Sequence, residues 1–178
     1  MSPTRTVESL LPLVGQGAAV FAQRLGGWAL LGHLPSESGD WSYRTGAVTS
    51  SRTMRAVRDA AGEVEAMIDL GWSTLVVQKK AGSTTFPRTV LVGRSSTNDI
   101  ALPHASVSKL HARLQLGGAG PVLSDAGSSN GTIVNGEQLR RDEEISLTSG
   151  DLVRFGGVAL QAFSPEHLFS ILARYHDA

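Results

Sequence analysis

The sequence predicts a mainly β protein, in which an antiparallel sandwich carries an N-terminal helical pair and a short C-terminal helix. From about residue 73, apolar residues recur with a period of two in many short runs, which is typical of half-buried strands. Turn residues separate these runs every 8–15 residues, as in antiparallel sandwiches. Before and after this region the apolar spacing is three and four, which is helical. We therefore expect a helical extension over 1–72, a sandwich domain over 73–163 and a helical tail over 164–178.

Two apolar stripes predict the N-terminal helices. The first has Pro12 in its first turn and stops at Gly26-Gly27, and the second begins with a cap at Ser50 or Ser51 and ends at Gly71. A loop rich in Gly, Ser and Pro joins them. The second helix has arginines early and acidic residues late, the reverse of what the helix dipole favours, so packing must hold it. The stripes are Val7, Leu11, Val14, Ala18, Phe21, Leu25 and Trp28, then Met54, Val57, Ala61, Val64 and Ile68.

The simplest interpretation of these stripes is that both helices face the core. The alternative is that residues 1–72 present a stripe to a second copy of the chain or to another protein.

Eight runs predict the strands of the sandwich. In "LHARLQL" (110–116), the leucines and Ala112 alternate with His111, Arg113 and Gln115, so the two sets are expected on opposite faces. Asn135-Gly136 and Gly156-Gly157 are dipeptides that favour two-residue hairpins, because they tolerate positive φ. The runs are "STLVVQK", "RTVLVG", "LHARLQL", "PVLSD", "GTIVNG", "EISL", "DLVRFG" and "VALQAF".

The tail predicts one more helix. Ser164 is a cap, Pro165 suits the first turn and Glu166 lies near the positive end of the dipole. Its apolar face is Leu168, Leu172 and Tyr175.

Composition excludes several classes of function. Lys plus Arg and Asp plus Glu both total 16 in the 178 residues, so no excess charge indicates nucleic acid or an anionic membrane. The absence of cysteine excludes disulfides and thiolate sites and suits a cytoplasmic protein. The apolar stretch 10–32 is interrupted by Gln16, Gln23 and Arg24, so no membrane span is expected. A cleaved signal ending near Ala22 is the alternative.

Polar residues that are hard to explain as solvated surface collect in three places, each at a strand end. These are "VGRSS" (92–96), "SVSKLH" (106–111) and "GSSNGT" (127–132). Together they offer a guanidinium (Arg94), an ammonium (Lys109), hydroxyls (Ser108, Ser129) and an amide (Asn130). These groups suit a phosphate dianion attached to a peptide.

The three motifs, in this order, resemble the forkhead-associated (FHA) domain family. The supporting stretches are "NDIAL", Asp125 and "LTSGDLVRFG", and the resemblance covers roughly residues 73–163. It implies an FHA-type sandwich whose loops bind a Thr-phosphorylated protein or peptide, with a Ser/Thr kinase acting upstream in signalling or regulated assembly.

The resemblance also assigns roles to individual residues. Arg94 and Ser108 would contact the phosphate, Lys109 would add a further contact, Ser129 would line the phosphothreonine pocket, and Asn130 would bind the ligand backbone. A second set would shape and brace the loops, namely Gly93, His111, Gly131, Asn135 and Gly136.

Other functions have less support. Ser108, His111 and Asp125 could suggest a hydrolase, but no nucleophile-elbow pattern accompanies them, so no catalytic residue and no enzyme activity is expected. The remaining histidines lack ligand spacing, so neither a metal nor a cofactor is expected. The competing hypothesis is a phosphate-independent structural adaptor that oligomerises or anchors through its helical extension.

Overall fold

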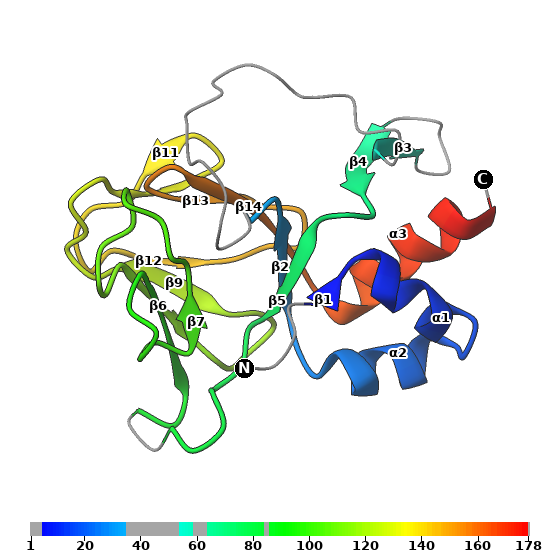
Figure 1. The fold of residues 1–178 in the computed structure, drawn as a ribbon, viewed down its shortest axis with the longest axis horizontal. Coiled ribbons are helices and arrows are strands. Elements are labelled where there is room, and N and C mark those ends of the chain that lie inside the picture. Colours follow the sequence, from blue (N-terminus) through cyan, green and yellow to red (C-terminus); the bar gives the residue numbers. More distant parts are fainter. Residues whose placement is uncertain (1–4, 35–53, 59–63, 84–85, 178) are drawn as a thin grey trace.

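The computed structural model describes residues 5–34, 54–58, 64–83 and 86–177. Two antiparallel sheets form a sandwich, and helices lie beside one end of the larger sheet (Figure 1). This confirms the predicted mainly β, antiparallel class. The loop and the Ser50 or Ser51 cap predicted between the N-terminal helices fall largely outside the described residues.

The larger sheet has seven strands and the smaller has five. Within the described residues, neighbouring strands of these two sheets run antiparallel except β6 and β7, which are parallel. The larger sheet has the order β1 (Arg5–Thr6), β5 (Ser73–Val76), β2 (Ala29–Gly32), β14 (Val158–Phe163), β13 (Leu152–Phe155), β10 (Thr132–Val134) and β11 (Glu137–Gln138). The smaller has the order β12 (Glu144–Ser146), β9 (Val122–Asp125), β8 (Ala112–Gln115), β6 (Thr89–Gly93) and β7 (Ile100–Ala101). All eight predicted runs contain strands.

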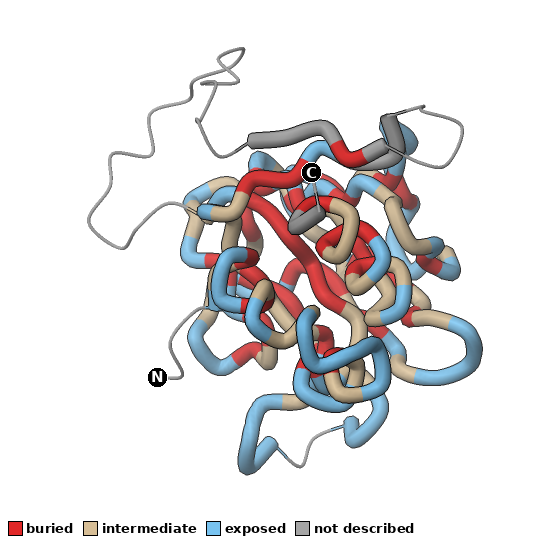
Figure 2. The backbone as a smooth tube through the Cα atoms, turned by 90° about the vertical axis from the view of Figure 1, so that its right-hand side faces the viewer, coloured by how far each residue is buried: buried red, intermediate tan, exposed pale blue. Residues whose placement is uncertain are grey.

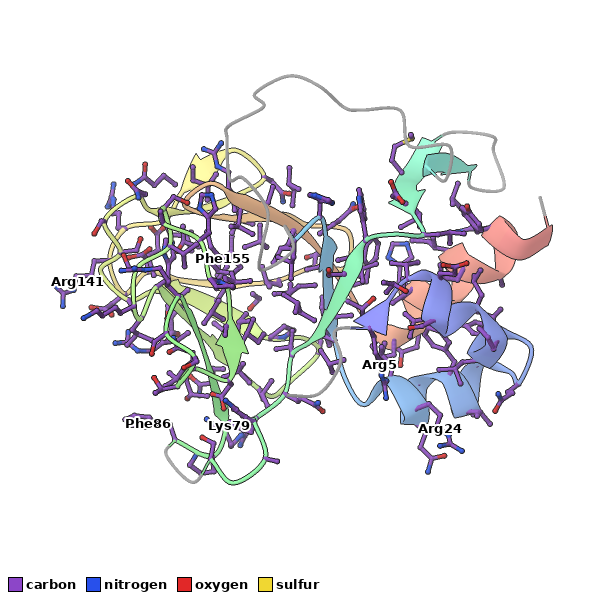
Figure 3. The ribbon with its side chains drawn as sticks, viewed as in Figure 1. Arg5, Arg24, Lys79, Phe86, Arg141 and Phe155 are labelled. Carbon is purple, nitrogen blue, oxygen red and sulfur yellow. The ribbon has the colours of Figure 1, made fainter. Side chains whose placement is uncertain are left out.

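The first core lies between the two sheets and follows from the period-two pattern. Ala112 and Leu114 of β8 are fully buried, while Arg113 and Gln115 point outward. Phe155 lies in the interior of the sandwich (Figure 3). The alternation fails before β8 begins, because Leu110 is 37% exposed and His111 is fully buried. The prediction that His111 shares the outward face is therefore wrong.

Two predicted hairpins are present. Asn135 and Gly136 have φ of 51° and 89° and connect β10 to β11, which is the geometry that the Asn-Gly dipeptide favours. Gly156, with φ of 58°, begins the turn between β13 and β14.

A second core packs against the outer face of the larger sheet. Residues 8–25 form a 3₁₀ turn (Glu8–Leu10) followed by α1 (Leu11–Val14) and α2 (Ala18–Leu25), and the tail forms α3 (Pro165–Asp177). Gly26, in the left-handed region, ends α2 as predicted. The backbone N–H of His167 donates to Ser164 Oγ at 3.2 Å, which confirms the predicted cap of α3. The buried residues of this core, red in Figure 2, come from both the sheet and the helices and include Phe21, Leu25, Phe163, Leu168 and Leu172.

The second predicted helix is absent, and its segment forms two strands. β3 (Met54–Arg58) and β4 (Val64–Asp69) pair antiparallel, with Val57 opposite Ala66, and β3 contacts α3. Val57 and Ile68 are buried in the second core. The prediction of a helix over 54–68 is therefore wrong. A short apolar run can fit the helical and the strand period at once, and tertiary packing then determines which structure forms.

The expectation of a purely helical extension over 1–72 also needs correction. β2 lies inside the larger sheet between β5 and β14. All four of its residues are buried because Leu30 faces the first core, whereas Ala29 and Leu31 face the second. The N-terminal segment therefore supplies a central strand as well as helices.

None of the helices in the described part of the chain combines the length and the apolar character that crossing a bilayer requires.

Candidate functional site

Three loops of the sandwich meet at one end and bring the sequence-predicted residues together. Loop 94–99 follows β6, loop 102–111 precedes β8, and loop 126–131 joins β9 to β10. The backbone N–H of Arg94 donates to the carbonyl of Ser108 at 2.8 Å. Ser108 Oγ accepts the backbone N–H of Ser129 at 3.0 Å and lies 3.5 Å from Ser129 Oγ. Arg94, Ser108 and Ser129 are thus neighbours, although 35 residues separate the first from the last.

The two cations of these loops are exposed. Arg94 Nε donates to the carbonyl of Val107 at 3.1 Å, which fixes the guanidinium against loop 102–111 and leaves both Nη groups to other acceptors. Lys109 is also exposed. Within the described residues, the ion pairs involve other cations, so neither Arg94 nor Lys109 has a carboxylate partner there.

Gly93 allows loops 94–99 and 102–111 to approach each other. A Cβ at this position would overlap the carbonyl oxygen of Lys109. That oxygen also accepts the Asn98 amide at 2.6 Å, and Asn98 is only 5% exposed. A glycine is therefore required where the backbones meet.

Asp99 braces the other end of loop 94–99. Its carboxylate pairs with Lys79 Nζ at 2.7 Å and accepts the backbone N–H groups of Lys80 and Leu91. Burial raises the pKa of this carboxyl, but these bonds together hold the pKa below its ordinary value. Lys79 lies at the base of the sandwich as drawn in Figure 3.

His111 joins the loop of Ser108 to the loop of Ser129. Its Nδ1 accepts the backbone N–H of Ser108 at 3.0 Å, so Nε2 carries the proton and donates to the carbonyl of Gly131 at 3.0 Å. Phe155 packs edge-on against the ring. Burial lowers the pKa of His111, against smaller opposing effects of Gly131 and Asp125. The imidazole is therefore neutral at pH 7 and acts as a structural bridge.

This bridge predicts a pH dependence of folding. The unfolded histidine binds a proton near its ordinary pKa of 6.5, whereas the folded one resists it until lower pH. Stability therefore falls as pH drops below about 6.5, by up to about 1.4 kcal/mol per pH unit. Urea unfolding of the wild type and of His111→Asn should be measured between pH 8 and 5. The free energy of unfolding should fall less steeply as the pH drops in the variant than in the wild type. An equal fall in both proteins would exclude His111 as the source of the pH dependence. Asp99 and Asp125, whose pKa values are lowered from 3.8, lose their contribution only below that range.

Asp125 organises the loop that carries Ser129 and Asn130. Its carboxylate accepts the backbone N–H groups of Gly127 and Ser128 and the hydroxyls of Ser128 and Thr132, at 2.6–2.9 Å. Burial raises the pKa of this carboxyl, but the four bonds together lower the pKa below its ordinary value. The rigidity of the loop thus comes from a buried acceptor.

The remaining predicted residues occupy two different places. Asn130 is exposed in loop 126–131, and its Nδ2 donates to the carbonyl of Ser106 at 2.8 Å. Asn135 and Gly136 lie at the opposite end of β10, where Asn135 bonds Asp151 and Leu152. Asn135 and Gly136 therefore form the turn between β10 and β11 and do not contribute to the three loops.

Two residues of the loops were missed in the sequence. Asn98 bridges loops 94–99 and 102–111, and Ser106 contacts Asn130. Asn98 begins "NDIAL" and Ser106 begins "SVSKLH", two polar stretches that the sequence singles out, but only the folded geometry gives these residues their partners.

An open pocket of about 410 Å³ adjoins loop 126–131. Its lining includes Gly127, Ser128, Gly131 and Arg141 but neither Arg94 nor Ser108. Arg141 lies at the outer rim of the molecule in Figure 3. In the described part of the chain, no three His, Asp or Glu side chains are grouped so that they could hold a metal ion.

Comparison with known proteins gives the family of this region. The family model described as "FHA domain" matches residues 90–156. An FHA domain-containing protein of Arabidopsis thaliana is 36% identical over 69 residues, which are 38% of this chain and 18% of that protein. An ABC transporter ATP-binding/permease protein of Mycobacterium tuberculosis is 36% identical over 74 residues, 42% of this chain and 8% of that protein. The chain thus spans less than a fifth of these relatives.

Two solved structures are also similar to this chain. EmbR of Mycobacterium tuberculosis, in complex with a low-affinity phosphopeptide, is 32% identical with a TM-score of 0.40, over 43% of this chain and 20% of that one. The N-terminal FHA domain of Saccharomyces cerevisiae Rad53, in complex with a phosphothreonine peptide, is 22% identical with a TM-score of 0.44, over 55% of this chain and 88% of that one. The sequence motifs and the family match together show that this chain carries an FHA domain, matched over residues 90–156.

Proposed function

We propose that this FHA domain binds a Thr-phosphorylated protein or peptide through Arg94, Ser108, Lys109, Ser129 and Asn130. One observation carries the proposal. Two exposed cations, Arg94 and Lys109, stand on loops 94–99 and 102–111, which the bond from Arg94 Nε to the carbonyl of Val107 joins, and neither cation has a carboxylate partner within the described residues. Such a set of donors has an unmatched positive charge that a phosphate dianion would neutralise. FHA domains as a class recognise phosphorylated motifs in this way.

In the proposed complex, phosphorylation is read as a change in charge. A kinase adds about −1.5 to −2 charges to a threonine, together with three acceptor oxygens. The Nη groups of Arg94 and the ammonium of Lys109 donate to these oxygens, and charge-assisted bonds are about twice as strong as neutral ones. The unphosphorylated threonine offers one hydroxyl and no charge, so it cannot replace the phosphate.

Asn130 would fix the register of the peptide. Since a carbonyl only accepts, Nδ2 must face Ser106. Oδ1 and the second N–H remain for the ligand, and this acceptor–donor pair matches the C=O and N–H of a peptide backbone. In this proposal the phosphate binds through its charge, and Asn130 fixes where the peptide backbone lies.

The proposed role is that of a non-enzymatic adaptor in signalling or regulated assembly, with a Ser/Thr kinase upstream. A direct test is calorimetric titration of the protein with a library of phosphothreonine peptides and with their unphosphorylated twins. We expect binding to members of the phosphorylated set only. Equal affinity for both sets would contradict the proposal and would favour the phosphate-independent adaptor.

A further inference from the structure

Ser106 is the point at which loop 102–111 joins two other parts of the FHA domain. Its carbonyl accepts the side-chain amide of Asn130 at 2.8 Å. Its hydroxyl accepts the backbone N–H of Gly157, in the turn between β13 and β14, at 2.7 Å. The same hydroxyl lies 2.6 Å from Nδ1 of His104. One serine thus bonds a loop of the candidate site and a distant hairpin.

The directions of these bonds are fixed by chemistry. His104 Nδ1 accepts the backbone N–H of Ser106 at 3.1 Å, so this nitrogen is an acceptor. Because Ser106 Oγ accepts from Gly157, its own proton is free to donate to His104 Nδ1. In this one orientation the Ser106 hydroxyl both accepts a hydrogen bond from Gly157 and donates one to His104.

The hairpin is shaped to allow this contact. Gly156 has φ of 58°, and a Cβ there would overlap the carbonyl oxygen of Ser106 and lie 2.9 Å from its hydroxyl. The backbone N–H of Gly156 donates to the carbonyl of Gly131 at 3.0 Å. The turn therefore contacts both loop 102–111 and the residue that follows Asn130.

We propose that Ser106 is a positioning residue, which holds Asn130 in the orientation required for the peptide backbone by anchoring loop 102–111 to the turn at Gly156-Gly157. The inference rests on the proposed function, since it concerns the residue that would read the peptide backbone. Ser106 itself touches no phosphate in this scheme. Without its hydroxyl, the carbonyl loses its fixed place and Asn130 can turn its amide.

The test combines affinity with a readout on the Asn130 side chain. In Ser106→Ala, we expect about a threefold to tenfold rise in Kd for a phosphothreonine peptide, the effect of losing one or two hydrogen bonds. In an Asn130→Ala background the same change should have no further effect, because coupled residues are not additive. Ser146→Ala, at an exposed serine of β12 outside the three loops, is the matched control and should leave Kd unchanged. Additive losses would overturn the proposal.

The NMR signals of the Asn130 Nδ2 protons separate this inference from the proposed function. In the wild type without ligand, one of the two protons should exchange slowly because it is bonded to Ser106, and in Ser106→Ala this protection should disappear. Unchanged protection would overturn the positioning role whatever the affinity. A wild type that binds no phosphopeptide would contradict the proposed function alone. Should Ser106→Ala fail to fold, Ser106→Cys keeps most of the volume with a weaker hydrogen-bonding group and replaces it in both measurements.

Discussion

Arg94→Ala should weaken phosphopeptide binding by about 1.5–3 kcal/mol, which is roughly a tenfold to 150-fold rise in Kd. The side chain is exposed, so its removal leaves no cavity. Its bond to the carbonyl of Val107 orients the guanidinium and contributes little to the fold. The change should therefore appear in calorimetric titration with the phosphopeptide, while the urea midpoint moves little.

Two controls make this expectation specific. Arg140→Ala removes another exposed arginine, whose backbone and not its side chain makes the bond to Glu143, and it should leave Kd unchanged. Arg94→Lys keeps the charge but loses the two-pronged donor, so its Kd should lie between wild type and Arg94→Ala. An Arg94→Ala protein with wild-type affinity would remove Arg94 from the site.

The grouping of the site residues could be predicted because each motif stands at the end of a strand. "VGRSS" follows the period-two run of β6, and "SVSKLH" precedes that of β8. In a sandwich such ends gather in space. What the sequence could not supply is the pairing between loops. The bond from Ser129 to the Ser108 hydroxyl and the position of Ser106 depend on distances between chain segments far apart in sequence.

The N-terminal region shows where local patterns stop being sufficient. Phe21 and Leu25 follow a helical stripe and do form the buried face of α2. The run from Val64 to Asp69 also fits a helical period, yet it pairs with β3. The predicted second helix would have arginines in its first part and acidic residues in its last part. This order is unfavourable for the helix dipole and was a local signal against a helix. Packing against the second core favours strands over a helix here, because the two-stranded sheet of β3 and β4 places Val57 and Ile68 in that core.

Deleting residues 1–72 should unfold the protein, contrary to the expectation from sequence that 73–163 forms a separate domain. The deletion removes β2 from the middle of the larger sheet and leaves the edge of β14 unpaired. It also uncovers side chains of the second core that stay in the fragment, namely Phe163, Leu168, Ile171 and Leu172. At about 1.5–3 kcal/mol for each exposed side chain, the loss equals most of the roughly 5–15 kcal/mol that stabilises a domain.

A series of fragments of different length measures how much of the lost free energy of unfolding comes from removing β2. A fragment of residues 28–178 keeps β2 but lacks the first helices, so its free energy of unfolding should fall between those of the full chain and of residues 73–178. Urea unfolding followed by circular dichroism gives the order. A cooperative transition of the 73–178 fragment near the full-length midpoint would show that the sandwich does not need β2. Because β14 follows directly on the Gly156-Gly157 turn that contacts Ser106, loss of β2 should also weaken phosphopeptide binding in any fragment that remains folded.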